Sequence, residues 1–287
     1  MTDSPTTRYL GHRELLFSIV YNMLGSVADT EDVLQDVWLA WTSNSERHVD
    51  NPRAYLVRIA INAALARRAT VQRRRETYVG QWLPEPLLTE PDAAEPVLRT
   101  ETFSMALLVV LETLSPLERA TFVLHEAFAF SHTEIAEMLG RSPAAVRQLA
   151  HRAREHVRAR RPRHPTDDHT RAEVTRRFVE AALGGDLTAL LDVLAPEVTL
   201  WTDGGGKGPA VSLRPVRGRD RVAALFNAVA AGIDQPYDVR YRPVNGDASA
   251  LIFDTGAPLA AIIVEVTDGR VQGIYAVTNP DKLTHVG

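Results

Sequence analysis

The sequence predicts a multidomain protein in which two all-α modules precede a C-terminal α+β module. Apolar residues recur at helical spacing through most of the first 160 residues. Four strand-like runs with two hairpin turns fill residues 237–277. Proline-containing breaks separate the modules, because proline interrupts helices. We expect the boundaries at 1–76, 77–97, 98–162, 163–169 and 170–287.

The overall composition excludes several classes of protein. The chain has 287 residues, 45% of them hydrophobic, and no cysteine, so disulfides and thiolate metal sites are excluded. The N-terminus lacks a signal-peptide pattern, and no apolar run is long enough to span a bilayer. We therefore expect a cytoplasmic protein without a membrane partner, and the sequence indicates neither a metal site nor a cofactor.

Positive charge is concentrated in two segments of a chain whose net charge is −4. Residues 53–75 hold seven arginines and no acid, and residues 141–163 hold eight arginines and one acid. Two basic segments within an acidic average are typical of a chain that meets phosphate at only part of its surface. Solvated helix faces and the arginine bias of a GC-rich genome are the alternative explanations.

The first module is predicted to contain an acidic helix followed by an arginine-rich helix. Leu34, Val37, Trp38 and Trp41 form one apolar stripe. The opposite face carries Asp32, Gln35 and Asp36. The helix dipole also explains acids in a first helical turn, here Asp29, Glu31 and Asp32, but it does not explain Asp36. The next helix is expected to begin at Pro52 with Asn51 as its N-cap.

Residues 130–155 predict a helix-turn-helix. Ser131 and Glu134 form a capping box, Gly140 suits the turn, and Ser142 with Pro143 begins a second helix. That helix turns Val146, Leu149, Ala150 and Ala153 inward. Its outer face carries Arg147, Gln148, His151 and Arg152. Such side chains can donate to base edges and phosphates, although an ordinary helical hairpin would share the pattern.

The last module is expected to begin with helices and to end in an antiparallel meander. A helix ending at Gly184-Gly185, a short helix capped by Asp186 and a helix from about Val222 precede the strands. Asn245-Gly246 and Asp268-Gly269 are hairpin turns. We expect the strands at 237–244, 248–253, 259–266 and 271–277.

In this order and spacing, the motifs of the first two modules resemble those of extracytoplasmic-function sigma factors of RNA polymerase. The matching stretches are DTEDVLQDVWLAW, NPRAYLVRIAINAALARRA and the helix-turn-helix. The resemblance implies that Asp32, Gln35 and Asp36 bind the β′ clamp helices of core RNA polymerase. It also implies that the second module contacts the β flap and reads the promoter −35 element through Arg147, Gln148, His151 and Arg152.

The resemblance gives the arginine-rich helix a role at the promoter −10 element. It implies that this helix and the loop after it open the duplex and capture a base of the non-template strand, as cationic grooves with aromatic or amide groups do. Tyr55, Arg58 and Asn62 match positions used there, and Arg67 and Arg68 would hold backbone phosphates.

The third module resembles the SnoaL-like, cone-shaped domains of the nuclear-transport-factor-2-like fold. Sigma factors that carry this extension share three short motifs, all found here: WLPEP at 82–86, DGGGK at 203–207 and NPDKL at 279–283. The resemblance implies regulation in cis. The residues concerned are Trp82, Pro84, Glu85, Asp203, Gly204, Gly205, Lys207, Asn279, Asp281 and Lys282.

Two other functions were weighed against a sigma factor. A one-component transcription regulator would join a helix-turn-helix to a ligand domain. An enzyme of the SnoaL type would need a pocket acid or base, and the strands from 237 to 277 offer only Asp238, Asp254 and Glu265. Asp203 is the best-placed acid, but it belongs to a glycine-rich turn. We therefore expect no enzyme activity. A small-molecule ligand of the third module stays open, and no anti-sigma factor is evident.

Overall fold

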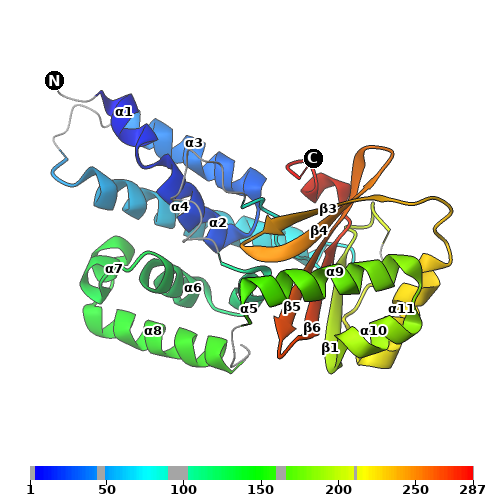
Figure 1. Cartoon of the computed structure of the whole chain (residues 1–287). Helices are drawn as coiled ribbons and strands as arrows, with labels where there is room; N and C mark the ends of the chain where they lie inside the picture. The colour runs from blue at the N-terminus through cyan, green and yellow to red at the C-terminus, as the bar shows by residue number, and fades with distance from the viewer. Residues whose placement is uncertain (1–3, 44–48, 90–102, 160–165, 210–211, 287) are drawn as a thin grey trace. The chain divides into compact units, whose positions relative to one another are not determined.

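The computed structural model describes residues 4–43, 49–89, 103–159, 166–209 and 212–286 (Figure 1). Their Cα positions form two compact units. Unit 1 comprises Met1–Glu76, Pro91–Phe103 and Leu107–Arg161, and unit 2 comprises Thr77–Glu90, Ser104–Ala106 and Pro162–Gly287. Part of the predicted linker, from Thr77 onward, therefore belongs to the second unit. Residues 90–97 of that linker, and Arg160, Arg161 and Arg163, lie outside the described part of the chain.

The N-terminal part of the chain is helical. Its elements are α1 (Pro5–Leu10), α2 (Arg13–Leu24), α3 (Val27–Ser43), α4 (Pro52–Glu76), α5 (Met105–Leu111), α6 (Pro116–Phe122), a π-helical turn (Val123–Ala127), α7 (His132–Leu139) and α8 (Pro143–Arg158). Buried apolar side chains of α2, α3 and α4 and of α6, α7 and α8 belong to one continuous core. The two predicted helical modules thus share a core within unit 1.

The helix-turn-helix has the predicted local chemistry. The Ser131 and Glu134 side chains each accept from the other's backbone N–H, and Gly140 ends α7 with a positive φ of 61°. The Ser142 hydroxyl caps α8, which has Pro143 at its first turn. The amphipathic pattern of α8 is also confirmed, since Val146, Leu149, Ala150 and Ala153 are buried.

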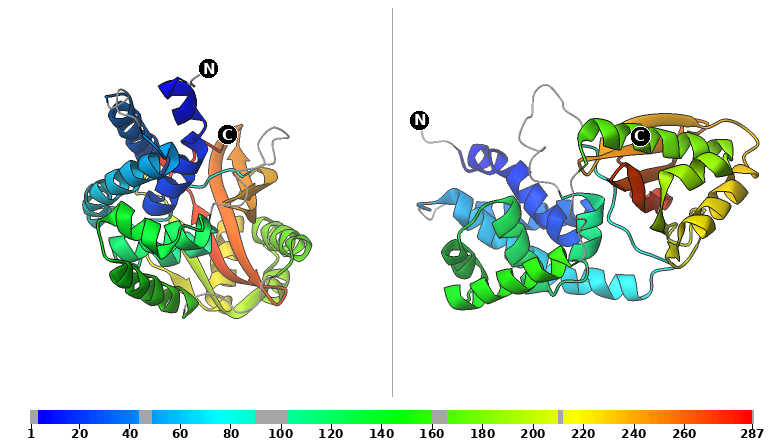
Figure 2. Two further views of the ribbon diagram at one scale, coloured as in Figure 1. Left: turned by 90° about the vertical axis from the view of Figure 1, so that its left-hand side faces the viewer. Right: turned by 60° about the horizontal axis from the view of Figure 1, so that its bottom comes forward.

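Unit 2 is an α+β domain with a six-stranded sheet. Its strands are β1 (Leu194–Asp203), β2 (Val216–Arg217), β3 (Asp238–Val244), β4 (Asp247–Asp254), β5 (Ala257–Thr267) and β6 (Arg270–Val277), in the order β2-β1-β6-β5-β4-β3. Helices α9 (Asp168–Gly184), α10 (Leu187–Val193) and α11 (Arg219–Ala230) contribute to the same core, and α9 runs along one face of the sheet (Figures 1 and 2).

The predicted meander from β3 to β6 is antiparallel, as expected. Both predicted hairpin turns have positive φ at both central residues, which matches the twist of the strands. Strand β1, which pairs parallel with β6, was not predicted. Alternation along β1 is obscured because Leu194 and Ala195 are both buried before the strand becomes regular. The turn at Thr255-Gly256, whose threonine has a φ of 47°, was not predicted either.

Candidate functional site: the linker clamp and the nucleic-acid faces

Asp203, the last residue of β1, holds the linker within unit 2. Its side chain is fully buried. Oδ2 accepts from the Leu83 backbone N–H at 2.7 Å and from Lys282 Nζ at 2.7 Å. Oδ1 accepts from the Tyr78 hydroxyl at 2.5 Å. A buried carboxylate is stable only when charge and hydrogen bonds compensate its lost hydration, so the linker and Lys282 are required partners.

Lys282 closes the same network from the C-terminal side. Its ammonium donates to the Leu83 carbonyl at 2.5 Å and lies 4.2 Å from the centroid of the Trp82 ring. It also lies 5.1 Å from the centroid of the Tyr78 ring, so two linker aromatic rings contact one cation. We call Tyr78, Trp82, Leu83, Asp203, Asn279 and Lys282 the linker clamp.

The phenol of Tyr78 stays protonated in the clamp. Burial raises its pKa, and the hydrogen bond to Asp203 raises it further. The hydroxyl also accepts from Asn279 Nδ2 at 2.8 Å, while Asn279 Oδ1 accepts from the Asp281 backbone N–H. Tyr78 was not predicted as a site residue, although it is an aromatic side chain only four positions before Trp82.

The glycines of the DGGGK motif permit this close approach. Gly205 has a φ of 58°, and a Cβ there would lie 2.3 Å from Asn279 Nδ2. Gly208, which was not predicted, is equally constrained, because a Cβ would lie 1.9 Å from the Thr278 carbonyl oxygen. At the exposed rim, Lys207 pairs with Asp281 at 2.6 Å. The predicted motif residues therefore lie together, with Gly204 and Pro84 buried and Glu85 half-buried.

Beyond the clamp, the linker continues along the edge of the sheet. The Asn245 N–H donates to the Leu87 carbonyl at 2.8 Å, and the Thr89 N–H donates to the Pro243 carbonyl at 3.1 Å. Leu88 forms a β-bridge with Val244. Since β3 is an edge strand, these bonds satisfy backbone groups that would otherwise face solvent.

The predicted acidic face of α3 is exposed. Asp32, Gln35 and Asp36 are exposed, whereas Asp29 is buried. Asp29 accepts from Arg67 at 2.9 Å and from Arg74 at 2.6 Å, and Arg67 also pairs with Asp32. Burial would raise the pKa of Asp29, but the hydrogen bonds from Arg74 and Arg67 lower it overall. Asp29 therefore forms ion pairs with two arginines of α4, a role that the helix-dipole interpretation did not predict.

The predicted −10 residues on α4 differ in accessibility. Tyr55 is half-buried beside Trp41, with the Arg58 guanidinium 5.6 Å from its ring centroid. Asn62 is exposed as a residue, yet its amide donates to the Arg58 carbonyl and, at 3.1 Å, to the Met138 carbonyl of α7. In this conformation the helix-turn-helix therefore covers part of the predicted base-reading position.

Arg68 was expected to hold a backbone phosphate, but it is buried in this conformation. It is 5% exposed, and its guanidinium donates to the Met23 carbonyl. It lies 3.7 Å from the Glu112 carboxylate, and burial lowers its pKa to about 10. Its place in the helical pattern puts it on the inner side of α4, so it packs inside unit 1 and does not present its charge to a phosphate in this conformation.

Arg68 is one of three arginines that surround Glu112. Arg75 and Arg119 also pair with this carboxylate. The three guanidinium groups donate to three successive carbonyls at the C-terminal end of α2, those of Asn22, Met23 and Leu24. This cluster joins α2 and α4 to the turn after α5 and to α6, so it links the two predicted helical modules within unit 1.

On α8, all four predicted −35 residues are exposed: Arg147, Gln148, His151 and Arg152. Arg152 pairs with Glu118 of α6 at 3.1 Å while its side chain stays 63% exposed. The face therefore presents two arginines, an amide and an imidazole from a rigid, capped helix, which is the chemistry that the major groove accepts.

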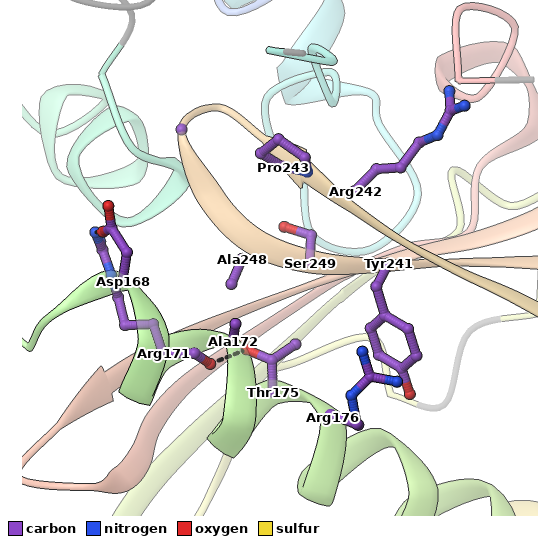
Figure 3. Close-up of a pocket in the computed structure, with 11 residues that line it drawn as sticks. Asp168, Arg171, Ala172, Thr175, Arg176, Tyr241, Arg242, Pro243, Ala248 and Ser249 are labelled. Atoms are coloured by element: carbon purple, nitrogen blue, oxygen red, sulfur yellow. Dashed lines mark hydrogen bonds and ion pairs between the residues drawn. The ribbon is translucent and has the colours of Figure 1, made fainter. Parts of the chain in front are cut away.

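The three strand carboxylates that could act as an acid or base lie apart in unit 2. Asp238 and Asp254 are exposed, and Glu265 is half-buried, 3.4 Å from the Tyr275 hydroxyl. A surface pocket of about 300 Å³ lies between α9 and strands β3 and β4, with Arg176 facing the Tyr241 ring and Arg171 paired to Asp168 (Figure 3). The described part of the chain holds no group of three or more His, Asp or Glu that could bind a metal ion.

The chain is similar in sequence and in structure to known proteins. Residues 9–75 match the family model for sigma-70 region 2, and residues 104–157 match that for sigma-70 region 4. The extracytoplasmic-function (ECF) RNA polymerase sigma factor SigJ of Mycobacterium tuberculosis is 38% identical over 95% of this chain and 91% of its own length. The chain belongs to the extracytoplasmic-function sigma factors of RNA polymerase. As such, it is an alternative sigma factor that directs promoter-specific transcription.

Two further matches extend over nearly the whole sigma factor. The crystal structure of SigJ from Mycobacterium tuberculosis has a TM-score of 0.77 at 34% identity, covering 98% of each chain. A probable ECF sigma factor, SigI of the same organism, is 29% identical over 98% of this chain and 95% of its own length. The match to SigJ includes unit 2, which confirms the α+β C-terminal extension. A one-component regulator is not favoured.

Proposed function

We propose that this sigma factor is regulated in cis by unit 2, through the linker clamp. The observation that carries the proposal is the buried Asp203 carboxylate, whose partners include the Leu83 N–H and Tyr78 hydroxyl of the linker. The linker begins directly after α4, the helix proposed to act at the −10 element. Holding the linker therefore restrains the C-terminal end of that helix.

The acidic face of α3 is proposed to bind the β′ clamp helices of core polymerase. Asp36 is exposed and lies beyond the first turn, so helix capping does not explain it. Asp32 shares Arg67 with Asp29, which leaves Gln35 and Asp36 as the more accessible part of the face. The proposed contact of unit 1 with the β flap rests on the family alone.

The DNA faces are proposed on α4 and α8. Tyr55, Arg58, Asn62 and Arg67 would act at the −10 element, and Arg147, Gln148, His151 and Arg152 at the −35 element. The Asn62 amide is engaged by the Met138 carbonyl, so this base-reading function requires α7 to move away from α4. Arg68 would contribute only if the Glu112 cluster opened.

We further propose that unit 2 is not an enzyme. The Asp203 carboxylate is committed to the clamp, and the other candidate acids are exposed or half-buried at separate positions of the sheet. No anti-sigma factor is evident from the sequence, and whether one binds this chain is untested. Within the described residues, no helix is both long and apolar enough to span a membrane.

The core-binding proposal is tested by reversing charge on α3. Asp36→Arg should lose binding to purified core RNA polymerase and abolish promoter-dependent transcription in vitro. Glu137→Arg on α7 is the matched control, because Glu137 is also an exposed helical acid but lies outside the proposed face. Equal core affinity of Asp36→Arg and the unaltered chain would contradict this part of the proposal.

A further inference from the structure

Unit 2 contains an apolar cavity of about 340 Å³ between α9, α11 and the sheet. Aromatic and aliphatic side chains form most of its wall, including Phe178, Phe226, Leu200 and Ile262. Among the described residues that line it there is no carboxylate, lysine, arginine or histidine. The volume falls within the range of small-molecule sites, which are lined in the same way.

The lining defines the class of ligand. A charged group would lose its hydration without meeting a counter-charge, so an ion is excluded by its desolvation cost. Among the described lining residues, Tyr237 and Thr278 are the two whose side chains carry a polar group. The Thr278 hydroxyl already donates to the Pro209 carbonyl at 2.7 Å. Water is also a poor occupant, because it needs two or more polar partners.

The wall of the cavity is continuous with the linker clamp. Thr278 and Pro209 both line the cavity. The Thr278 N–H donates to the Asp203 carbonyl at 2.8 Å, and the N–H of Asn279, a clamp residue, donates to the same oxygen at 2.9 Å. A molecule that packs against Thr278 and Pro209 therefore touches the segments that fix the Asp203 backbone.

We propose that the cavity binds an uncharged, largely hydrocarbon small molecule, and that its binding strengthens the hold of Asp203 on the linker. Occupancy orders Thr278 and Pro209, and those residues in turn hold the backbone that aims the carboxylate at Leu83. The regulatory part rests on the proposed cis regulation, whereas the binding part does not.

Binding is tested on the full chain with the uncharged fluorophore N-phenyl-1-naphthylamine. We expect saturable binding that raises the unfolding temperature, because a ligand that binds only the folded state stabilises it. Decanol should displace the probe, and decanoate, with an equally long chain but a charge, should displace it at least tenfold less well. Absence of saturable binding, or equal displacement by the two, would overturn the proposal.

The cavity is assigned by filling it. Ala260→Leu on β5 and Ala182→Leu on α9 place extra methyl groups at the wall and should weaken probe binding at least tenfold. Ala228→Leu is the control, because Ala228 is exposed on α11. Folding of each variant is checked by circular dichroism. Undiminished affinity in a folded wall variant overturns the assignment, and the displacement test on the unaltered chain stands if both variants unfold.

Coupling to the clamp is tested without polymerase. Because coupling between two sites is reciprocal, Asp203→Asn should weaken probe binding several-fold. Asp192→Asn, an exposed acid on α10, should leave it unchanged. Unchanged affinity in Asp203→Asn would overturn the coupling while leaving the binding site intact. Failure of cis regulation would appear separately, as unaltered transcription by the Asp203 variant.

Discussion

At the scale of single residues, Asp203 shows how one buried charge organises distant segments. Its carboxylate accepts hydrogen bonds from Tyr78 and Leu83 of the linker and from Lys282, which follows the last strand. The three successive glycines of the DGGGK motif, which begins at Asp203, allow other segments to approach this turn closely. The partner Tyr78 could not be predicted, since sequence separation of more than a hundred residues hides which hydroxyl meets which carboxylate.

Removing the charge of Asp203 should release the linker. In Asp203→Asn, Lys282 loses its counter-charge, so the clamp is destabilised by about 3–5 kcal/mol, as for other buried ion pairs that lose one partner. Hydrogen exchange should then rise across residues 77–89. Asp192→Asn should leave the exchange of this segment unaltered. Protection that persists in Asp203→Asn would show that the carboxylate does not hold the linker.

Gly208 should tolerate no side chain. A Cβ there would meet the Thr278 carbonyl oxygen at 1.9 Å, and a backbone atom cannot rotate away. Gly208→Ala should therefore destabilise unit 2 by about 1–3 kcal/mol, the usual cost of overpacking. Gly184→Ala is the control, since its added Cβ would meet no atom within 4 Å beyond its chain neighbours and the adjacent backbone of its own helix. Thermal unfolding followed by circular dichroism measures both, and equal midpoints would refute the packing argument.

At the scale of secondary-structure elements, features set by neighbouring residues were predicted more accurately than features set by contacts distant in sequence. The capping box at Ser131, the turn at Gly140 and the hairpin at Asn245-Gly246 depend on neighbours in sequence, and all three were predicted correctly. The parallel pairing of β1 with β6 depends on contacts far apart in sequence. Burial of Arg68 likewise depends on its partner Glu112, which is distant in sequence. The concentration of arginines in this segment does not indicate which of them has a buried partner.

The Glu112 cluster should be the most sensitive ionic element of unit 1. Glu112→Gln leaves Arg68, Arg75 and Arg119 without their shared carboxylate and should lower the stability of unit 1 by about 3–5 kcal/mol. Glu137→Gln, an exposed acid on α7, should change it by less than ~1 kcal/mol. Urea unfolding followed by circular dichroism compares them, and similar midpoints would contradict the role of the cluster.

The same cluster predicts a dependence on acid. Burial would raise the pKa of Glu112, but Arg119 and Arg75 outweigh this effect, so its folded-state pKa lies below the usual value. Its contribution to stability is therefore complete above the unfolded-state pKa of about 4.3 and is lost as pH falls through the lower folded-state value. Urea midpoints measured between neutral and acidic pH should fall less in Glu112→Gln than in the unaltered chain. Parallel curves would show that Glu112 does not contribute in this way.

At the scale of the whole molecule, the linker connects helix α4 directly to the clamp of unit 2. The chain leaves α4 at Glu76 and within two residues reaches Tyr78, whose hydroxyl is bonded to Asp203. The linker continues to Thr89, bonded to the edge strand of unit 2. Helix α4 and unit 2 are therefore joined by a segment that unit 2 holds by specific hydrogen bonds.

Transcription in vitro with purified core RNA polymerase tests this account most directly. The unaltered chain should give a promoter-dependent transcript, and Asp203→Asn and Trp82→Ala should each change its yield several-fold in the same direction at equal protein concentration. Asp192→Asn should match the unaltered chain. Transcript yields that are identical for the clamp variants, the control and the unaltered chain would contradict regulation through the linker clamp.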